Sequence, residues 1–208
     1  EDVPLHEGEW CLLARTNRIV SQYANTLREE GLVYSRHGHP SIPAKTYEAL
    51  EDWEKWAKGE TLTPSKVRNV YTFMEAGEGY SKGFGPRSSA LLEVQGAVEI
   101  SMSEARDKMG LLIDGSVRWH RALGKIDLET NALKWGENVR NPRIKLSTIH
   151  SMKGGEADNV LVVPDLSYAA HREYQREPDT EHRVFYVAVT RAKQALHIML
   201  PETNKCYE

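Results

Sequence analysis

The sequence predicts an α/β protein in which a parallel sheet, flanked by helices, is interrupted by a mainly helical insertion. Three observations lead to this prediction. Short β-branched and apolar runs occur near both ends of the chain, and amphipathic helical patterns alternate with them there. The middle of the chain lacks that alternation. Strands that alternate with helices are typical of parallel α/β sheets.

The first strand is predicted at residues 10–14, followed by the polar turn Arg15-Thr16-Asn17. Asn17 is a candidate N-cap for a helix whose apolar residues keep to one face until Gly31 ends it. A second strand is expected at residues 32–35. This strand, turn, helix and strand unit puts the polar turn at the carboxyl edge of the sheet, where open α/β sheets bind ligands.

The C-terminal part contains two more strand-like runs, at residues 144–149 and 159–163, with a polar loop between them. After a polar connection, residues 182–193 have apolar positions at helical spacing, and Arg191 is expected in the last turn of that helix. A final strand is predicted at residues 195–200.

Residues 40–142 are interpreted as an insertion into the α/β domain, which is then formed by residues 1–39 and 143–208. Capping and periodicity predict several helices in the insertion. They are expected at 45–58, from Thr63-Pro64, from Ser101 with Glu104 completing a capping box, near 114–124, and from 127; the glycine-rich stretch 77–86 is expected to be a loop. Trp53 and Trp56 could stack on bases, but their helical spacing favours packing.

The composition is typical of a soluble globular protein and argues against a membrane protein or one stabilised by disulfides or zinc. The chain has 208 residues, 40% of them hydrophobic, and its 27 basic and 30 acidic residues give a formal net charge of −3. No apolar run is long enough to span a membrane, so no membrane partner and a cytoplasmic location are expected. Cys11 and Cys206 form neither a disulfide framework nor a metal site, and His37 and His39 lack the further ligands that zinc needs.

Three stretches resemble conserved motifs of superfamily 1 DNA helicases of the UvrD/Rep/PcrA type. STIHSMKGGEADNVLVV (residues 147–163) is similar to the fifth motif and VFYVAVTRAKQALHI (residues 184–198) to the sixth. LLARTNRIVSQYANTLREEGLVY (residues 12–34) resembles the fourth motif and the helix after it. The resemblance implies a RecA-like second motor domain (2A) with a helical 2B-like insertion, although about one hundred residues is short for a full UvrD-type insertion.

The resemblance also implies roles at an ATP site. Arg191 and Arg15 would contact the γ-phosphate, Glu156 the ribose, and Gly154 with Gly155 would let the backbone approach closely. Simpler roles are a helix C-terminal cation for Arg191, a surface salt bridge for Arg15 and a solvated carboxylate for Glu156. The family's Gly-Leu-Glu-Phe is Gly-Gly-Glu-Ala here, so the apolar packing of this loop is expected to differ.

The polar loop supplies the residues that the resemblance places on single-stranded DNA phosphates: Thr148, His150, Ser151 and Lys153. Such contacts position a strand without reading its sequence. A hydrogen-bonded structural histidine is the alternative for His150. Tyr186 lies in the sixth motif, which the resemblance places near the nucleotide cleft, but an aromatic residue on an apolar helix usually belongs to the core.

The chain is therefore predicted to be the C-terminal motor portion of an ATP-dependent 3′–5′ DNA helicase or translocase. Its partners would be single-stranded or partly duplex DNA and the N-terminal motor domain of the same protein, which would hold most of the ATP and Mg²⁺. No Walker A motif is present in these residues, so the chain alone is not expected to hydrolyse ATP. The alternatives are a non-catalytic nucleic-acid or protein-binding module on the same fold and, less favoured, a part of a RecB-like helicase-nuclease.

Overall fold

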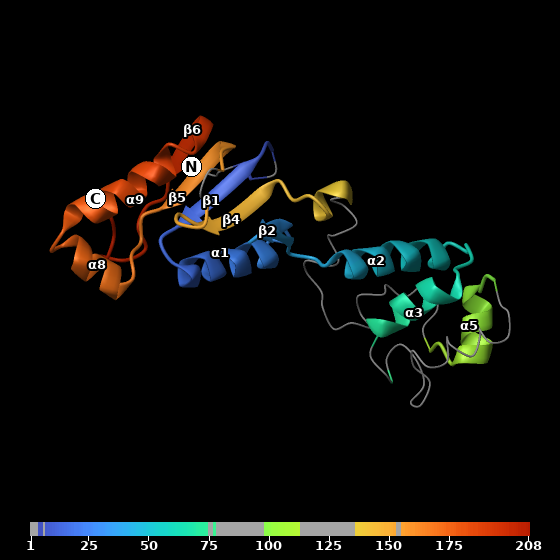
Figure 1. The fold of residues 1–208 in the computed structure, drawn as a ribbon. Coiled ribbons are helices and arrows are strands. Elements are labelled where there is room, and N and C mark those ends of the chain that lie inside the picture. The colour runs from blue at the N-terminus through green and yellow to red at the C-terminus, as the bar shows by residue number, and fades with distance from the viewer. Residues whose placement is uncertain (1–3, 6, 75–76, 78–97, 113–135, 153–154) are drawn as a thin grey trace. The chain divides into compact units, whose positions relative to one another are not determined.

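The computed structural model describes residues 4–5, 7–74, 77, 98–112, 136–152 and 155–208. The chain divides into two compact units, one of residues 1–41 with 137–208 and one of residues 42–136 (Figure 1). The predicted boundaries lay at 39/40 and 142/143. The first unit extends past residue 39 because the short strand His39–Pro40 pairs with the strand before it.

The first unit is built on a six-stranded sheet with the order β3-β2-β4-β1-β5-β6. Its strands are β1 (Trp10–Ala14), β2 (Tyr34–Arg36), β3 (His39–Pro40), β4 (Ile144–Thr148), β5 (Ala157–Val163) and β6 (Ala192–Ile198). The pairings of β1 with β4 and β5, of β2 with β4, and of β5 with β6 are parallel, whereas β2 and β3 pair antiparallel. The predicted α/β class, with a mostly parallel sheet flanked by helices, is confirmed.

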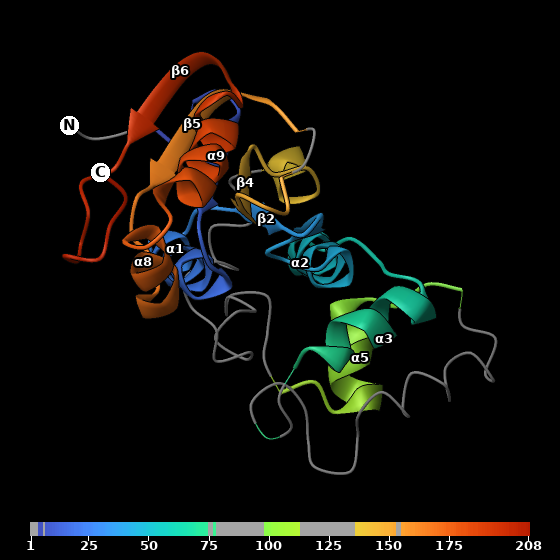
Figure 2. The same cartoon turned by 60° about the vertical axis from the view of Figure 1, so that its left-hand side comes forward.

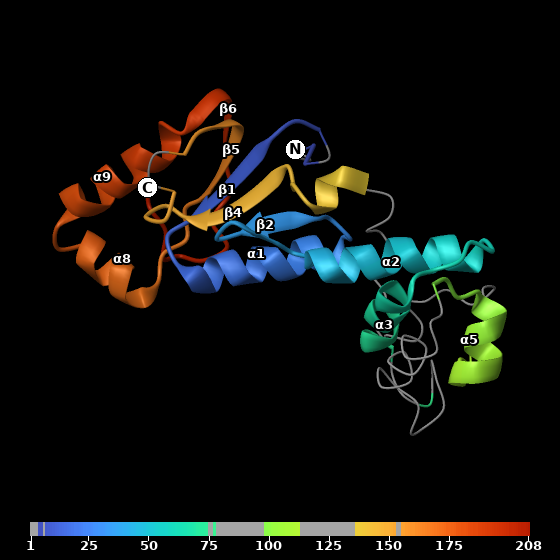
Figure 3. The same ribbon diagram turned by 45° about the vertical axis from the view of Figure 1, so that its right-hand side comes forward.

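Helices cover both faces of this sheet, on opposite sides of β1 (Figures 1, 2 and 3). Trp10 and Leu12 pack with α1 (Asn17–Glu29) in one apolar cluster. Cys11 and Leu13 point the other way, into a cluster with α8 (Tyr168–Tyr174) and α9 (Pro178–Val189). A strand buried on both faces is apolar throughout, which explains the uninterrupted run WCLLA.

Several element ends differ from the predictions. Thr16, not Asn17, caps α1, because its hydroxyl accepts a hydrogen bond from the Ile19 amide at 3.4 Å. The helix ends as predicted before Gly31, which has a φ of +69°. β6 begins three residues earlier than expected, at Ala192, and the predicted polar connection before residue 182 contains the whole of α8.

The helix α9 is shifted relative to its prediction. It begins at Pro178, which occupies its first turn together with Asp179 and Glu181, and ends at Val189. Proline fits the first turn of a helix because its missing N–H has no partner there, and acidic residues complement the helix dipole. Arg191 therefore lies beyond the helix rather than in its last turn, directly before β6.

The second unit contains α2 (Ala44–Ala57), α3 (Pro64–Thr72) and α5 (Met102–Met109). Trp53 and Trp56 are each 1% exposed and meet edge to face at 6.1 Å, so packing is their role in this unit. The predicted capping box of Ser101 and Glu104 is present at the start of α5. The helices predicted near 114–124 and from 127, and the loop 77–86 apart from Gly77, lie outside the described residues. No helix in the described ranges is long and apolar enough to cross a membrane.

The central position of β1 leads to a prediction about thiol reactivity. Burial raises the pKa of the Cys11 thiol to about 12, and the thiolate is the form that attacks disulfide reagents. At pH 8 in the native chain we expect Cys206 to react with such a reagent and Cys11 to react only after unfolding. A Cys206→Ser variant isolates Cys11. Equally fast reaction of Cys11 in this native variant would contradict the buried position of β1.

Candidate functional site

The carboxyl ends of three parallel strands lie level with one another in the sheet. Ala14, the last residue of β1, is in register with Thr148 of β4 and Val163 of β5. Arg15 follows Ala14 directly and therefore emerges at this carboxyl edge beside the turn that begins at Thr148. The edge is the one at which open α/β sheets bind their ligands.

Arg15 is held by a bidentate ion pair with Glu181 in the first turn of α9. Its Nε donates to both carboxylate oxygens, at 3.1 and 2.9 Å, and its Nη2 donates to Oε1 at 2.8 Å. The carboxylate is fully buried, and the arginine side chain is 21% exposed. The hydrogen bond to Glu181 raises the pKa of Arg15 above its ordinary value. The pair is thus mostly interior, unlike the surface salt bridge considered for Arg15.

Glu181 was not predicted as a site residue, although a pattern in the sequence points to it. Glu181 lies four and seven positions before Phe185 and Ala188, so all three share one face of α9. That face is buried. A carboxylate on a buried helical face requires a cationic partner, and an arginine directly after a core strand is a natural candidate.

Arg191 lies at the opposite edge of the sheet. Its carbonyl accepts a hydrogen bond from the amide of Ala157, the first residue of β5, and its Nε donates to the carbonyl of Val187 at 3.1 Å. Glu181 and Arg191 are ten positions apart, which is roughly 15 Å along a helix axis. Arg15 and Arg191 therefore lie at the two ends of α9. A single triphosphate could contact both arginines only if both side chains extend along that helix toward each other.

Glu156 precedes β5 and so lies at the same edge as Arg191. Its carboxylate is 3.7 Å from Nζ of Lys193, and both side chains are about half exposed. Exposed pairs of this kind contribute little to stability, so the Glu156 carboxylate remains accessible. Gly155 is packed closely, since a Cβ there would come within 2.7 Å of Met152 Cε. Gly154 lies outside the described residues.

The turn after β4 holds the residues predicted to bind DNA. Thr148 is 7% exposed, and its hydroxyl lies 2.8 Å from that of Ser151 and accepts the Ser151 amide at 3.2 Å. Thr148 therefore fixes the turn from inside, whereas His150 and Ser151 are exposed on it. Lys153 falls outside the part of the chain that the structure describes.

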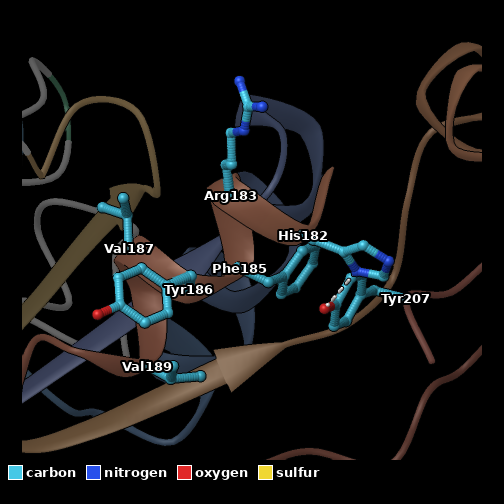
Figure 4. A pocket seen from close by; sticks show the side chains of 7 residues that line it. All are labelled: His182, Arg183, Phe185, Tyr186, Val187, Val189 and Tyr207. Atoms are coloured by element: carbon cyan, nitrogen blue, oxygen red, sulfur yellow. Dashed lines mark hydrogen bonds between the residues drawn. The ribbon is translucent and has the colours of Figure 1, made fainter. Parts of the chain in front are cut away.

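A groove of about 590 Å³ lies beside α9 and Tyr207 (Figure 4). Its lining is largely apolar and consists of His182, Arg183, Phe185, Tyr186, Val187, Val189 and Tyr207. The rings of Phe185 and Tyr207 stack with their centroids 4.1 Å apart, and Nδ1 of His182 lies 2.9 Å from the Tyr207 hydroxyl. Tyr186 is 68% exposed, so the core position favoured for it was wrong. It follows Phe185 by one position and points away from the buried face.

The fold and these positions define the class of protein. A mostly parallel sheet covered by helices on both faces, with polar residues after its strands, is consistent with the RecA-like α/β fold. The family model of the UvrD-like helicase C-terminal domain matches residues 39–203, and the chain belongs to this family. The matched range includes Glu156, Glu181 and Arg191 and begins after Arg15. A search of curated proteins found no match.

Loss of Arg15 should destabilise the first unit. An Arg15→Met substitution leaves the buried Glu181 carboxylate unpaired, and we expect it to lower the free energy of unfolding by about 3 kcal/mol, the low end for buried pairs because Arg15 is partly exposed. Denaturant unfolding, followed by hydrogen exchange in peptides from β1 and α9, measures the change.

The matched control for this experiment is the double variant Arg15→Met/Glu181→Met, which removes both charges and should recover most of the lost stability. A single variant as stable as the unmodified chain, or a double variant no better than the single one, would contradict the importance of the pair.

Proposed function

We propose that this chain is the C-terminal motor portion of an ATP-dependent 3′–5′ DNA helicase or translocase. It would supply the trans-acting half of the ATP site and part of the single-stranded DNA track. The observation that carries the proposal is the pair of arginines flanking α9, each fixed through its Nε. The N-terminal motor domain of the parent protein would bind most of the ATP and Mg²⁺.

The chemistry of phosphoryl transfer explains why two anchored arginines are useful. Negative charge on the γ-phosphate oxygens must be stabilised in the transition state, and donors that are already fixed need no reorganisation. Arg191 is fixed at the end of α9 by the bond from its Nε to the Val187 carbonyl. Within the described part of the chain its two terminal amino groups have no other partner, and they would bind the anion. Glu156, at the same edge, would accept hydrogen bonds from the ribose.

A single loop connects the two proposed contacts. The connection from β4 to β5 carries the exposed residues His150 and Ser151 at its start and Glu156 at its end. DNA contact by the turn at the carboxyl edge and ribose contact by Glu156 at the opposite edge would therefore belong to one segment. Closure of the N-terminal motor domain on ATP would then change the affinity for DNA, because nucleotide and DNA would both favour particular conformations of the same β4–β5 loop.

The alternative function is a non-catalytic binding module. The internal partners of Arg15 and Thr148 favour this alternative, because the ion pair with Glu181 and the hydroxyl contact with Ser151 are also explained by folding alone. The two functions differ in whether the parent protein hydrolyses ATP when single-stranded DNA is added.

An Arg191→Ala substitution in the parent protein tests the nucleotide role. We expect it to lower the DNA-stimulated kcat for ATP hydrolysis by at least about 100-fold, since a trans-acting arginine stabilises the transition state. Arg28→Ala is the control, because Arg28 is exposed in the last turn of α1 on the other face of the sheet. Unchanged turnover in the Arg191→Ala parent would remove Arg191 from the ATP site and favour the binding module.

His150→Ala and Ser151→Ala substitutions in the parent test the DNA role. Each should raise the single-stranded DNA concentration needed for half-maximal ATPase about three- to tenfold, which corresponds to one lost hydrogen bond. The increase should be equal for two unrelated sequences, because phosphate contacts carry no sequence information. His39→Ala, at the exposed edge strand β3, is the control. Unchanged values, or an effect on one sequence only, would contradict phosphate contact by this turn.

A further inference from the structure

The guanidinium group of Arg15 has two hydrogen-bonding edges, and Glu181 occupies one of them. The occupied edge consists of Nε and one hydrogen of Nη2, which bond to the two carboxylate oxygens. Across the residues that the structure describes, no partner is found for Nη1. The Arg15 side chain is 21% exposed, and we assign this exposure to the second edge because Glu181 covers the first.

Arg15 cannot leave Glu181 easily to meet such a ligand. The carboxylate of Glu181 is fully buried, and on release of the arginine it would remain in the interior as an unpaired charge, which is strongly unfavourable. A planar guanidinium with a bidentate partner also has little rotational freedom. The free edge of Arg15 is therefore fixed in direction, and an anion must come to it.

We infer that Glu181 is a positioning residue of the ATP site, which holds one edge of Arg15 so that the other faces the γ-phosphate during its transfer. The inference rests on the proposed function, because it takes Arg15 as the group that contacts the nucleotide. Glu181 itself does not touch the nucleotide. It acts by keeping a charge-bearing donor in place before the transition state forms.

This arrangement requires an arginine at position 15 and a carboxylate at position 181. A lysine could form the ion pair with Glu181, but its single ammonium has no second planar edge to present. A glutamine at position 181 keeps the size of the side chain but places an amide that donates where one carboxylate oxygen accepts. It would therefore turn the guanidinium away from its direction.

The experiment uses the full parent protein and two probes that differ only at the γ-position: Mg-ADP, and Mg-ADP with aluminium fluoride as an analogue of the transferring phosphoryl group. For Glu181→Gln we expect 10- to 100-fold weaker binding of the fluoride complex, as for a misplaced catalytic group, with Mg-ADP binding changed less than about twofold. The kcat for ATP should fall in the same proportion, with a smaller change in KM. A purely structural role would weaken both probes alike.

Arg15 variants separate this inference from the proposed function. Glu181→Gln added to Arg15→Met should reduce kcat by less than about twofold further, because it can act only through Arg15. The inference would be overturned if Glu181→Gln lowered the kcat of the Arg15→Met variant as much as it lowers that of the unmodified protein. If Arg15→Met lowers kcat but Glu181→Gln has no effect, the inference is overturned while the proposed function stands. If Arg15→Met itself has no effect, the assigned role of Arg15 and the inference both fail.

Arg15→Lys gives a second test that does not depend on folding of the Glu181→Gln variant, because the ion pair survives in it. We expect the Arg15→Lys parent to unfold at nearly the same temperature as the unmodified protein and yet to lose at least about tenfold in kcat. Full activity of this variant would show that the second edge of Arg15 is not used, and would overturn the inference.

Discussion

One buried ion pair connects the end of the central strand to the helix that lies beside the proposed ATP site. Arg15 and Glu181 are 166 positions apart in sequence, and they come together because β1 pairs with β4 and β5 across the insertion. The carboxylate is fully buried, and without its partner it would be an unpaired charge in the interior, which is strongly unfavourable. The same contact that completes the core thereby fixes the direction of a guanidinium at the carboxyl edge of the sheet.

The helix α9 acts as the common support of the site. Its first turn holds Arg15, its C-terminal end leads directly to Arg191, and its inner face packs Phe185 and Ala188 against the sheet. The positions of both arginines therefore depend on the packing of one helix rather than on flexible loops. The β4–β5 connection complements this support, because it joins the exposed turn at His150 to Glu156 near Arg191. In the proposed coupling of nucleotide state to DNA contact, α9 would hold the arginines in place while the β4–β5 connection changes conformation.

The sequence was most informative where periodicity is strong. The apolar run of β1 and the one-sided helix α1 were predicted nearly in place, since burial on both faces or on one face leaves a clear pattern. The seven residues of α8 are too few for a periodic pattern, and it was missed. Glu181 was missed for another reason. The role of a single charged residue on an apolar helical face depends on its partner, and Arg15 is far from it in the sequence. Tyr186 was expected in the core because helical spacing alone does not separate a buried residue such as Phe185 from an exposed residue next to it in the sequence.

The most direct test of this account is a crystal structure of the parent protein with single-stranded DNA, Mg-ADP and aluminium fluoride bound. We predict that Arg15 keeps its Nε on Glu181, as in the present structure, while Nη1 lies within hydrogen-bonding distance of the fluoride group at the γ-position. Arg191 should approach the same group from the other end of α9. A complex in which the fluoride group is fully surrounded by other donors, with Arg15 turned to solvent or released from Glu181, would contradict it.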